Sequence, residues 1–268
     1  MQKMNEKLEI VCVSNNLETF NQVIGANPNM NKYPITMFDN SNENIGISKR
    51  YNSYIEQNIT ADIDSWIIFC HQDFGFNEDP LKKIEKLSKK NIYGAIGVKA
   101  YFNLKRGLKG LLSQKTGSYF SCKINLKGLC CKNAKLFDTQ EFEPTSGFIK
   151  RKLLGQISQG QNSSDFEKSG RSLLFPKEVS NLDCCCLIVH SSLINKYNLR
   201  FDENLDWHMY VEDFCINCKK NHKIKSKAVQ FDCYHLGIGT LNDDFYNAAK
   251  YVKEKYNLKN LKTTCLDD

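Results

Sequence analysis

The sequence predicts an α/β fold: a mostly parallel sheet flanked by helices, with a basic insertion of loops and hairpins. Two observations indicate this fold. Within residues 8–100, short apolar runs rich in β-branched residues alternate with helical patterns, as in parallel strands joined by crossover helices. Residues 101–180 break the alternation and hold eight of the fifteen glycines. One large core is feasible at 268 residues, so we expect a single domain over 1–268.

The first hundred residues contain the clearest elements. The run Ser65–Cys70 is apolar throughout and is the strongest strand signal in the chain. Asp79 followed by Pro80 is typical of a helix start. We expect strands at Leu8–Ser14, Ile35–Phe38, Ser65–Cys70 and Tyr93–Val98, and helices at Leu17–Ile24, Ile47–Gln57 and from Asp79 to about Lys90.

Regular patterns return after residue 180. Asn181–Val189 and Ala228–Tyr234 read as buried strands. Helical patterns cover Ser191–Tyr197 and Val211–Asn221, and an amphipathic helix is expected at Asp243–Tyr256, within a C-terminal segment 241–268.

The composition predicts that the chain works inside a cell. The longest unbroken apolar run is Cys184–Val189, far shorter than the ~20 residues that cross a bilayer. The N-terminus has no signal-peptide pattern. Twelve cysteines, several adjacent, are then interpreted as free thiols in a reducing compartment. We therefore expect a cytoplasmic protein.

The net charge of +7 comes from one segment. Residues 101–180 hold 14 Lys and Arg against 6 Asp and Glu, and no acidic residue lies between Glu85 and Asp138. Such a surface could be merely soluble, or could face an anionic acceptor or the inner face of an anionic membrane. No nucleic-acid motif accompanies the charge, so we expect no nucleic-acid partner.

Polar clusters follow three of the expected strands: Asp39-Asn40, His71-Gln72-Asp73 and His235. In open α/β sheets, ligands bind beyond the carboxyl ends of the strands. His71 and Asp73 could ligate Mg²⁺ or Mn²⁺, which complete their shells with water and substrate phosphates. The structural alternative is a histidine that packs against or caps the next loop.

Two further patterns carry possible chemistry. Glu212-Asp213 opens a predicted helix, where a carboxylate could act as a general base or simply complement the helix dipole. A zinc site is also possible, with the ligands Cys215, Cys218, Cys233 and His235. Only Cys215 and Cys218 have the close spacing of zinc ligands, however, and packing in the core explains these two helical cysteines better.

Several motifs together resemble inverting family 2 glycosyltransferases of the GT-A fold, a Rossmann-like α/β sheet. The first half, 8–100, carries Asp39-Asn40-Ser41, Asn44-x-Gly46, Asn52 and a strand leading to Asp73. The second half, 181–240, carries Leu182-Asp183, Phe201-Asp202-Glu203, Glu212-Asp213-Phe214 and Tyr234-His235-x-Gly237. His71-Gln72-Asp73 stands where the family usually has Asp-x-Asp, as in a bacterial subgroup associated with surface polysaccharide assembly.

The resemblance implies a role for each matching residue. The nucleotide-sugar donor would be bound by Ser14, Asn15, Asp39, Asn40, Asn44 and Asp73. A divalent cation, Mg²⁺ or Mn²⁺, would be held by Asp73, His71 and His235. Asp213 would be the general base, with Glu212 beside it facing the acceptor.

The function implied is the transfer of a sugar, with inversion and metal assistance, from a nucleotide diphosphate sugar to a saccharide or lipid-linked saccharide. A UDP-sugar is the first choice of donor, and surface polysaccharide or lipooligosaccharide assembly is the expected setting. A non-catalytic nucleotide- or saccharide-binding protein on the same fold stays open, because His71 replaces the usual carboxylate. A nucleotidyltransferase is disfavoured, since Ser14–Leu17 is not a glycine-rich phosphate loop.

Overall fold

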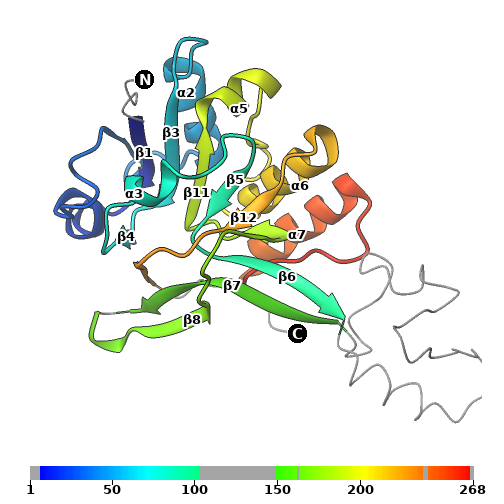
Figure 1. The fold of residues 1–268 in the computed structure, drawn as a ribbon. Helices are drawn as coiled ribbons and strands as arrows, with labels where there is room; N and C mark the ends of the chain where they lie inside the picture. The colour runs from blue at the N-terminus through cyan, green and yellow to red at the C-terminus, as the bar shows by residue number, and fades with distance from the viewer. Residues whose placement is uncertain (1–6, 103–148, 162, 238–240, 266–268) are drawn as a thin grey trace, which may run out of the picture.

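The computed structural model describes residues 7–102, 149–161, 163–237 and 241–265, which form a mixed α/β fold with two sheets (Figure 1). The larger sheet has seven strands in the order β2-β1-β3-β11-β5-β12-β9. The second has six: β10-β6-β7-β13-β4, with β8 also paired to β7.

The larger sheet is mixed, so the prediction of a mostly parallel sheet is wrong. Its strands are β1 (Lys7–Ser14), β2 (Ile35–Asp39), β3 (Ser65–His71), β5 (Ile92–Gly94), β9 (Lys177–Glu178), β11 (Cys186–His190) and β12 (Ser226–Ala228). β1 runs parallel to β2 and β3, and β12 runs parallel to β5. β11, however, lies antiparallel between β3 and β5, and β9 is antiparallel to β12.

The second sheet accounts for the remaining antiparallel pairs. It consists of β4 (Phe74–Phe76), β6 (Gly97–Phe102), β7 (Ile149–Gly160), β8 (Glu167–Arg171), β10 (Asn181–Leu182) and β13 (Cys233–Leu236). Only the β7–β13 pair is parallel among these described strands. β7 and β8 form a hairpin around a short 3₁₀ turn, Ser163–Asp165. Most of the basic segment, 103–148, lies outside the described residues.

Three predicted strands are in fact divided between the two sheets. Tyr93–Val98 becomes β5 and β6, Asn181–Val189 becomes β10 and β11, and Ala228–Tyr234 becomes parts of β12 and β13. At one of these breaks the Asp183 side chain accepts a hydrogen bond from the Cys185 backbone N–H at 2.9 Å, a local turn that ends β10. The chain therefore passes from one sheet to the other at each of these three breaks.

The helices mostly match the expectations. α1 (Leu17–Phe20) continues into a π-helical turn (Asn21–Gly25), and α2 (Ile47–Asn58), α5 (Ser191–Tyr197), α6 (Tyr210–His222) and α7 (Asp243–Tyr256) follow. α3 (Leu81–Ile84) is shorter than predicted, and hydrogen-bonded turns follow it. Ile84 is its only buried residue, so little apolar surface holds a longer helix against the sheet. Among the described residues, no helix is long and apolar enough to cross a membrane.

Both faces of the larger sheet are covered. The alternation along β1 places Leu8, Ile10 and Cys12 on one face and Val11 and Val13 on the other. The first face packs against α1, the π-helical turn and α3; the second packs against α2, α5, α6 and α7. The carboxyl ends of β1, β2 and β3 lie together at one edge of this sheet.

Candidate metal and donor site

The polar clusters predicted after the first strands lie at one edge of the larger sheet. In the parallel register, Ser14 at the end of β1 is level with Asp39 at the end of β2. Val13 is level with His71 at the end of β3. The Asn40 backbone N–H donates to the Ser14 carbonyl at 2.6 Å, which continues the pairing by one residue. The sheet therefore brings these segments together as the sequence suggested.

His71, Asp73 and His235 form a group whose potential ligand atoms all lie within 4.8 Å of one another. β4 follows Asp73 and pairs with β13 so that His235 lies opposite Phe74. The Nε2 atom of His235 is 3.1 Å from Oδ1 of Asp73, and the Nδ1 atom of His71 is 4.0 Å from the same oxygen. The three side chains are 24%, 23% and 14% exposed in chain order, so a small ligand can reach them.

The three groups shift one another's pKa values. Burial lowers the pKa of His71, and the positive charge of His235 lowers it further. Burial alone would raise the pKa of Asp73, but the hydrogen bond and charge of His235 outweigh it and the pKa is lowered. For His235, burial alone would lower the pKa, yet Asp73 raises it overall. The cluster thus has an ionised carboxylate beside two imidazoles, one of which stays neutral.

Tyr210, the first residue of α6, orients the His71 ring. Its hydroxyl lies 2.8 Å from His71 Nε2 and 3.3 Å from the Cys184 carbonyl, to which it can donate its proton. In that arrangement His71 Nε2 carries a hydrogen and donates to the tyrosine oxygen, which leaves Nδ1 with a free lone pair toward Asp73. Such an outer contact is typical of metal-binding histidines.

Gly237 leaves room beside the cluster. Its φ is +123°, a conformation that side chains rarely adopt, and an added Cβ would lie 3.0 Å from Asp73 Oδ2. Its N–H donates to the Gly160 carbonyl at 2.9 Å, which fixes the position. The glycine therefore keeps the second carboxylate oxygen of Asp73 open to a ligand.

Gln72 is a site residue that the sequence analysis missed. Its Oε1 accepts hydrogen bonds from Ser14 Oγ at 2.8 Å and from the N–H groups of Asn15 and Asn16 at 3.0 Å each. Its Nε2 donates to Asn15 Oδ1 at 2.9 Å. The middle residue of the His-Gln-Asp motif thus joins the loop after β1 to the end of β3. In the sequence, only the position of Gln72 between the candidate ligands His71 and Asp73 indicated a role for it.

The other predicted donor residues line the same edge less directly. Asp39 is exposed and accepts from the N–H and hydroxyl of Ser41, which lower its pKa. Asn40 is buried and donates to the Ile45 carbonyl at 2.8 Å. Asn44 is exposed in the loop between them and α2. Of the three, Asp39 and Asn44 are reachable by a ligand, whereas Asn40 shapes the loop.

The motif around Gly46 and Asn52 is structural. An added Cβ at Gly46 would clash with Asp206, whose carbonyl accepts a hydrogen bond from the Ile47 N–H at 2.8 Å. Asn52 donates to the Phe201 carbonyl at 2.9 Å and accepts from the Phe201 N–H at 2.9 Å. The two motifs that carried much of the resemblance therefore contact each other and position α2 against the loop before α6.

The carboxylates of Glu212 and Asp213 have different neighbours. Asp213 Oδ1 accepts from Lys255 Nζ at 2.7 Å, and the same ammonium binds Asp202 at 2.6 Å. Glu212 is 3% exposed; its Oε1 accepts from the Thr263 hydroxyl at 2.8 Å, and its Oε2 has no hydrogen-bond partner among the described residues. Burial raises the pKa of both, that of Glu212 to about 7.

Asp183 is electrostatically coupled both to Glu212 and to the histidine cluster. Its negative charge contributes to the pKa shifts of His71, His235 and Glu212. Its side chain also accepts a hydrogen bond from the Thr264 hydroxyl. Of the Glu212-Asp213 pair, Glu212 is thus the member on the side of the cluster, and residues 263–264 cover this side of the site.

The zinc alternative is wrong for the described residues. Cys215 and Cys218 pack in the core on the helix side of the sheet, whereas Cys233 packs in the core on the opposite face. All cysteines in the described part of the chain are free thiols. The group of His71, Asp73 and His235 is the only candidate metal cluster found among the described residues.

Comparisons with known proteins give a distant structural match. A crystal structure of S. aureus TarS aligns over 94% of this chain and 40% of that chain, with 11% identity and a TM-score of 0.40. A second, of TarS 1–349, aligns over 94% and 66% with 12% identity and a TM-score of 0.43. This chain spans less than two thirds of either TarS chain. No family model and no curated protein matches the sequence.

Proposed function

We propose that the chain is a metal-assisted glycosyltransferase that moves a sugar from a nucleotide diphosphate sugar to a hydroxyl of a saccharide acceptor. The observation that carries the proposal is the convergence of His71, Asp73 and His235 at the sheet edge formed by β1, β2 and β3. A donor with a charged leaving group needs such a cation site beside its diphosphate. The acceptor needs a nearby carboxylate, which Glu212 or Asp213 would provide.

The donor set fits a divalent cation. The ligands are the ionised carboxylate of Asp73, with its open second oxygen, and two imidazole nitrogens. A cation bound by these groups would keep coordination positions for water and phosphate oxygens. Two imidazoles are poor ligands for Mg²⁺, which prefers oxygen, so we propose Mn²⁺. The cation would neutralise the charge of the leaving diphosphate.

The nucleotide would lie along the loops after β1 and β2. Gln72 fixes the backbone of Asn15 and Asn16, and the exposed Asp39 carboxylate is free to accept hydrogen bonds on the same edge. Such a carboxylate suits a ribose hydroxyl or a base N–H. A UDP-sugar is the proposed donor.

Glu212 is the proposed proton acceptor. A carboxyl with a pKa of about 7 can both take and release a proton near neutral pH. The acceptor oxygen would give its proton to Glu212 and bond to the anomeric carbon opposite the leaving diphosphate. The carbon–oxygen bond to the diphosphate breaks and its electrons leave with that group, which inverts the configuration. Thr263 donates to Oε1 of Glu212, so Oε2, which has no hydrogen-bond partner among the described residues, is the oxygen that would take the proton.

The test is metal and donor binding by calorimetry, with UDP-sugars and Mn²⁺, followed by transfer to saccharide acceptors. Asp73→Asn is expected to weaken Mn²⁺ binding by about a hundredfold and to abolish metal-dependent donor binding. Asp62→Asn, an exposed carboxylate outside the site, is the matched control. Glu212→Gln should lower transfer and leave donor affinity unchanged; if Asp213→Asn alone does so, Asp213 is the base.

Two outcomes would separate the alternatives. Donor binding without transfer to any acceptor would support the non-catalytic nucleotide-binding protein. Tight binding of Fe²⁺ or Zn²⁺ with no UDP-sugar binding would contradict the proposal, because two imidazoles and one carboxylate also suit those ions.

A further inference from the structure

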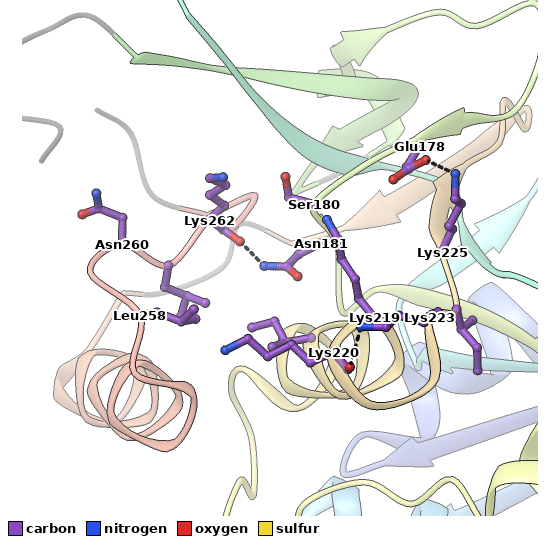
Figure 2. Close-up of a pocket in the computed structure, with 13 residues that line it drawn as sticks. Glu178, Ser180, Asn181, Lys219, Lys220, Lys223, Lys225, Leu258, Asn260 and Lys262 are labelled. Carbon is purple, nitrogen blue, oxygen red and sulfur yellow. Dashed lines mark hydrogen bonds and ion pairs between the residues drawn. The ribbon is translucent and has the colours of Figure 1, made fainter. Parts of the chain in front are cut away.

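A pocket on the other side of α6 is lined by lysines (Figure 2). Its volume is about 430 Å³, and its apolar floor includes Ile216, Ile224, Leu258 and Leu261. We call it the lysine pocket, because its charged lining consists of five lysines and one carboxylate, Glu178. The lysines are Lys219, Lys220, Lys223, Lys225 and Lys262.

The positive charge of the lysine pocket is only partly balanced. Glu178 pairs with Lys225 at 3.0 Å, which occupies the one carboxylate of the lining. Lys220 donates to the Tyr256 carbonyl at 2.7 Å and Lys223 to the Lys220 carbonyl at 3.4 Å, contacts that do not neutralise their charge. Lys219 makes no ion pair within 4.0 Å with the described residues, and Figure 2 shows it extending from α6 toward Ser180 and Asn181. Lysines gathered in this way repel one another unless an anion lies between them.

The helix dipole does not explain the whole cluster. Lys219 and Lys220 lie in the last turn of α6, where cations are favoured. Lys225 leads into β12 and Lys262 follows α7, so these two come from other elements. Asn181 donates to the Lys262 carbonyl at 2.5 Å and so holds the segment after α7 against β10. The pocket is therefore assembled from several elements.

The lysine pocket is separate from the metal and donor site. Tyr210, which contacts His71, begins α6, whereas Lys219 lies in its last turn. At 1.5 Å per residue they are roughly 14 Å apart along the helix axis. The pocket does not depend on the proposed glycosyltransferase activity.

We propose that the lysine pocket binds a phosphate group of a phosphate-bearing ligand. Several ammonium groups from separate elements suit a multiply charged, tetrahedral anion better than a single carboxylate. The volume has room for the group to which the phosphate is attached.

The phosphate can come from a free metabolite or from a lipid headgroup. Two exposed apolar side chains near the pocket distinguish these two sources. Leu174 and Phe175 are 94% and 71% exposed. Phe175 precedes Glu178 of the pocket by three residues, so the two Cα atoms are at most ~11 Å apart. If the source is a lipid, these apolar side chains should enter the bilayer when the pocket binds a headgroup.

The test measures pyrophosphate binding to the full chain by calorimetry in metal-depleted buffer, where the histidine cluster cannot contribute through a cation. Lys219→Gln with Lys223→Gln should weaken binding by about tenfold or more, because each lysine loses a charge-assisted contact. Lys82→Gln with Lys86→Gln removes the same charge from exposed positions on and just after α3 and should have little effect. Thermal unfolding checks that both variants fold.

A second arm identifies the source, with phosphatidylcholine vesicles that contain or lack phosphatidic acid. Vesicle binding that is lost in the lysine variant and weakened by Leu174→Ser with Phe175→Ser assigns a lipid. Pyrophosphate binding without vesicle binding assigns a free phosphate compound. The proposal is overturned if wild-type protein binds neither probe, or if the lysine variant and its control lose binding equally.

Discussion

The two ends of α6 contact regions of opposite chemistry. At its N-terminal end, Tyr210 contacts His71, Asp213 accepts from Lys255, and Glu212 accepts from Thr263. At its C-terminal end, Lys219 and Lys223 belong to a pocket with a single carboxylate. The first region holds the proposed cation site, and the second gathers lysines whose charge an anion would neutralise.

The difference shows how each region is stabilised. The first relies on protein partners, since Lys255 holds Asp202 and Asp213, and Thr263 holds Glu212. In the second, Lys225 pairs with Glu178, whereas Lys220 and Lys223 donate to backbone carbonyls, which do not neutralise their positive charge. A bound anion should therefore stabilise this region. One short segment touches both, because Lys262 lines the pocket and the next residue, Thr263, covers Glu212.

The largest effect is expected from Glu212, a buried titrating group of the first region. Its ordinary pKa is 4.5 and its folded pKa is about 7, so between these values the folded chain holds a proton that the unfolded chain has released. The free energy of unfolding should therefore fall as pH rises through this range, by about 3 kcal/mol in all. Glu212→Gln should remove that dependence and leave the protein more stable than wild type at pH 8.

Denaturant unfolding between pH 4 and pH 8 checks this. Glu85→Gln, at an exposed position, is the control and should keep the wild-type dependence. If Glu212→Gln shows the same slope as wild type, Glu212 does not hold a raised pKa and is a weaker candidate for the base.

A smaller effect is expected from Tyr210, which acts on the cation site through His71. Tyr210→Phe removes the hydroxyl that accepts from His71 Nε2, so the ring no longer has one favoured tautomer. Mn²⁺ affinity should fall by about tenfold, as is usual when an outer partner of a ligand is removed. Tyr54→Phe loses a comparable hydroxyl contact, to Glu9 at 2.6 Å, away from the site.

Calorimetric titration of Mn²⁺ separates orientation from fold stability. Equal losses of affinity in the two tyrosine variants would mean that Tyr210 acts only through stability. An unchanged affinity in Tyr210→Phe would remove His71 from the list of ligands.

The sequence predicted which strand ends meet at this edge of the sheet, for a local reason. Strand ends are marked by a change from apolar to polar residues, and parallel strands bring such ends together, as with Ser14, Asp39 and His71. His235 was also predicted, although its place depends on β13 pairing with β4 in the second sheet.

Features that depend on distant pairing were not predictable. An apolar run such as Asn181–Val189 has the same pattern whether it forms one strand or passes between two sheets. The roles of Gln72 and Tyr210 arise from contacts 56 to 139 residues apart in sequence. The lysine pocket was missed because its charges come from separate segments, whereas the basic run that the sequence displayed lies mostly outside the described residues.

The smallest expected effect tests whether the lysines of the second region lower the stability of the protein. α5, α6 and α7 all end in a left-handed residue; two of these are asparagine, Asn198 and Asn257, and the third is Lys223 with φ 59°. Asparagine tolerates this conformation better than lysine does. Lys223→Asn should therefore raise the free energy of unfolding by about 0.5 kcal/mol while it weakens pyrophosphate binding.

Asn198→Lys is the reverse control, since it adds a lysine to the same conformation at the end of α5 and should lower stability by a similar amount. At low ionic strength the gain in unfolding free energy of Lys223→Asn should be larger, because the variant also relieves repulsion with Lys219. At high salt the repulsion is screened, so only the gain from the backbone conformation should remain. A loss of stability in Lys223→Asn at both salt concentrations would mean that Lys223 is held by favourable contacts. The lysine pocket would then be a balanced structural surface, and the contrast between the two ends of α6 would disappear.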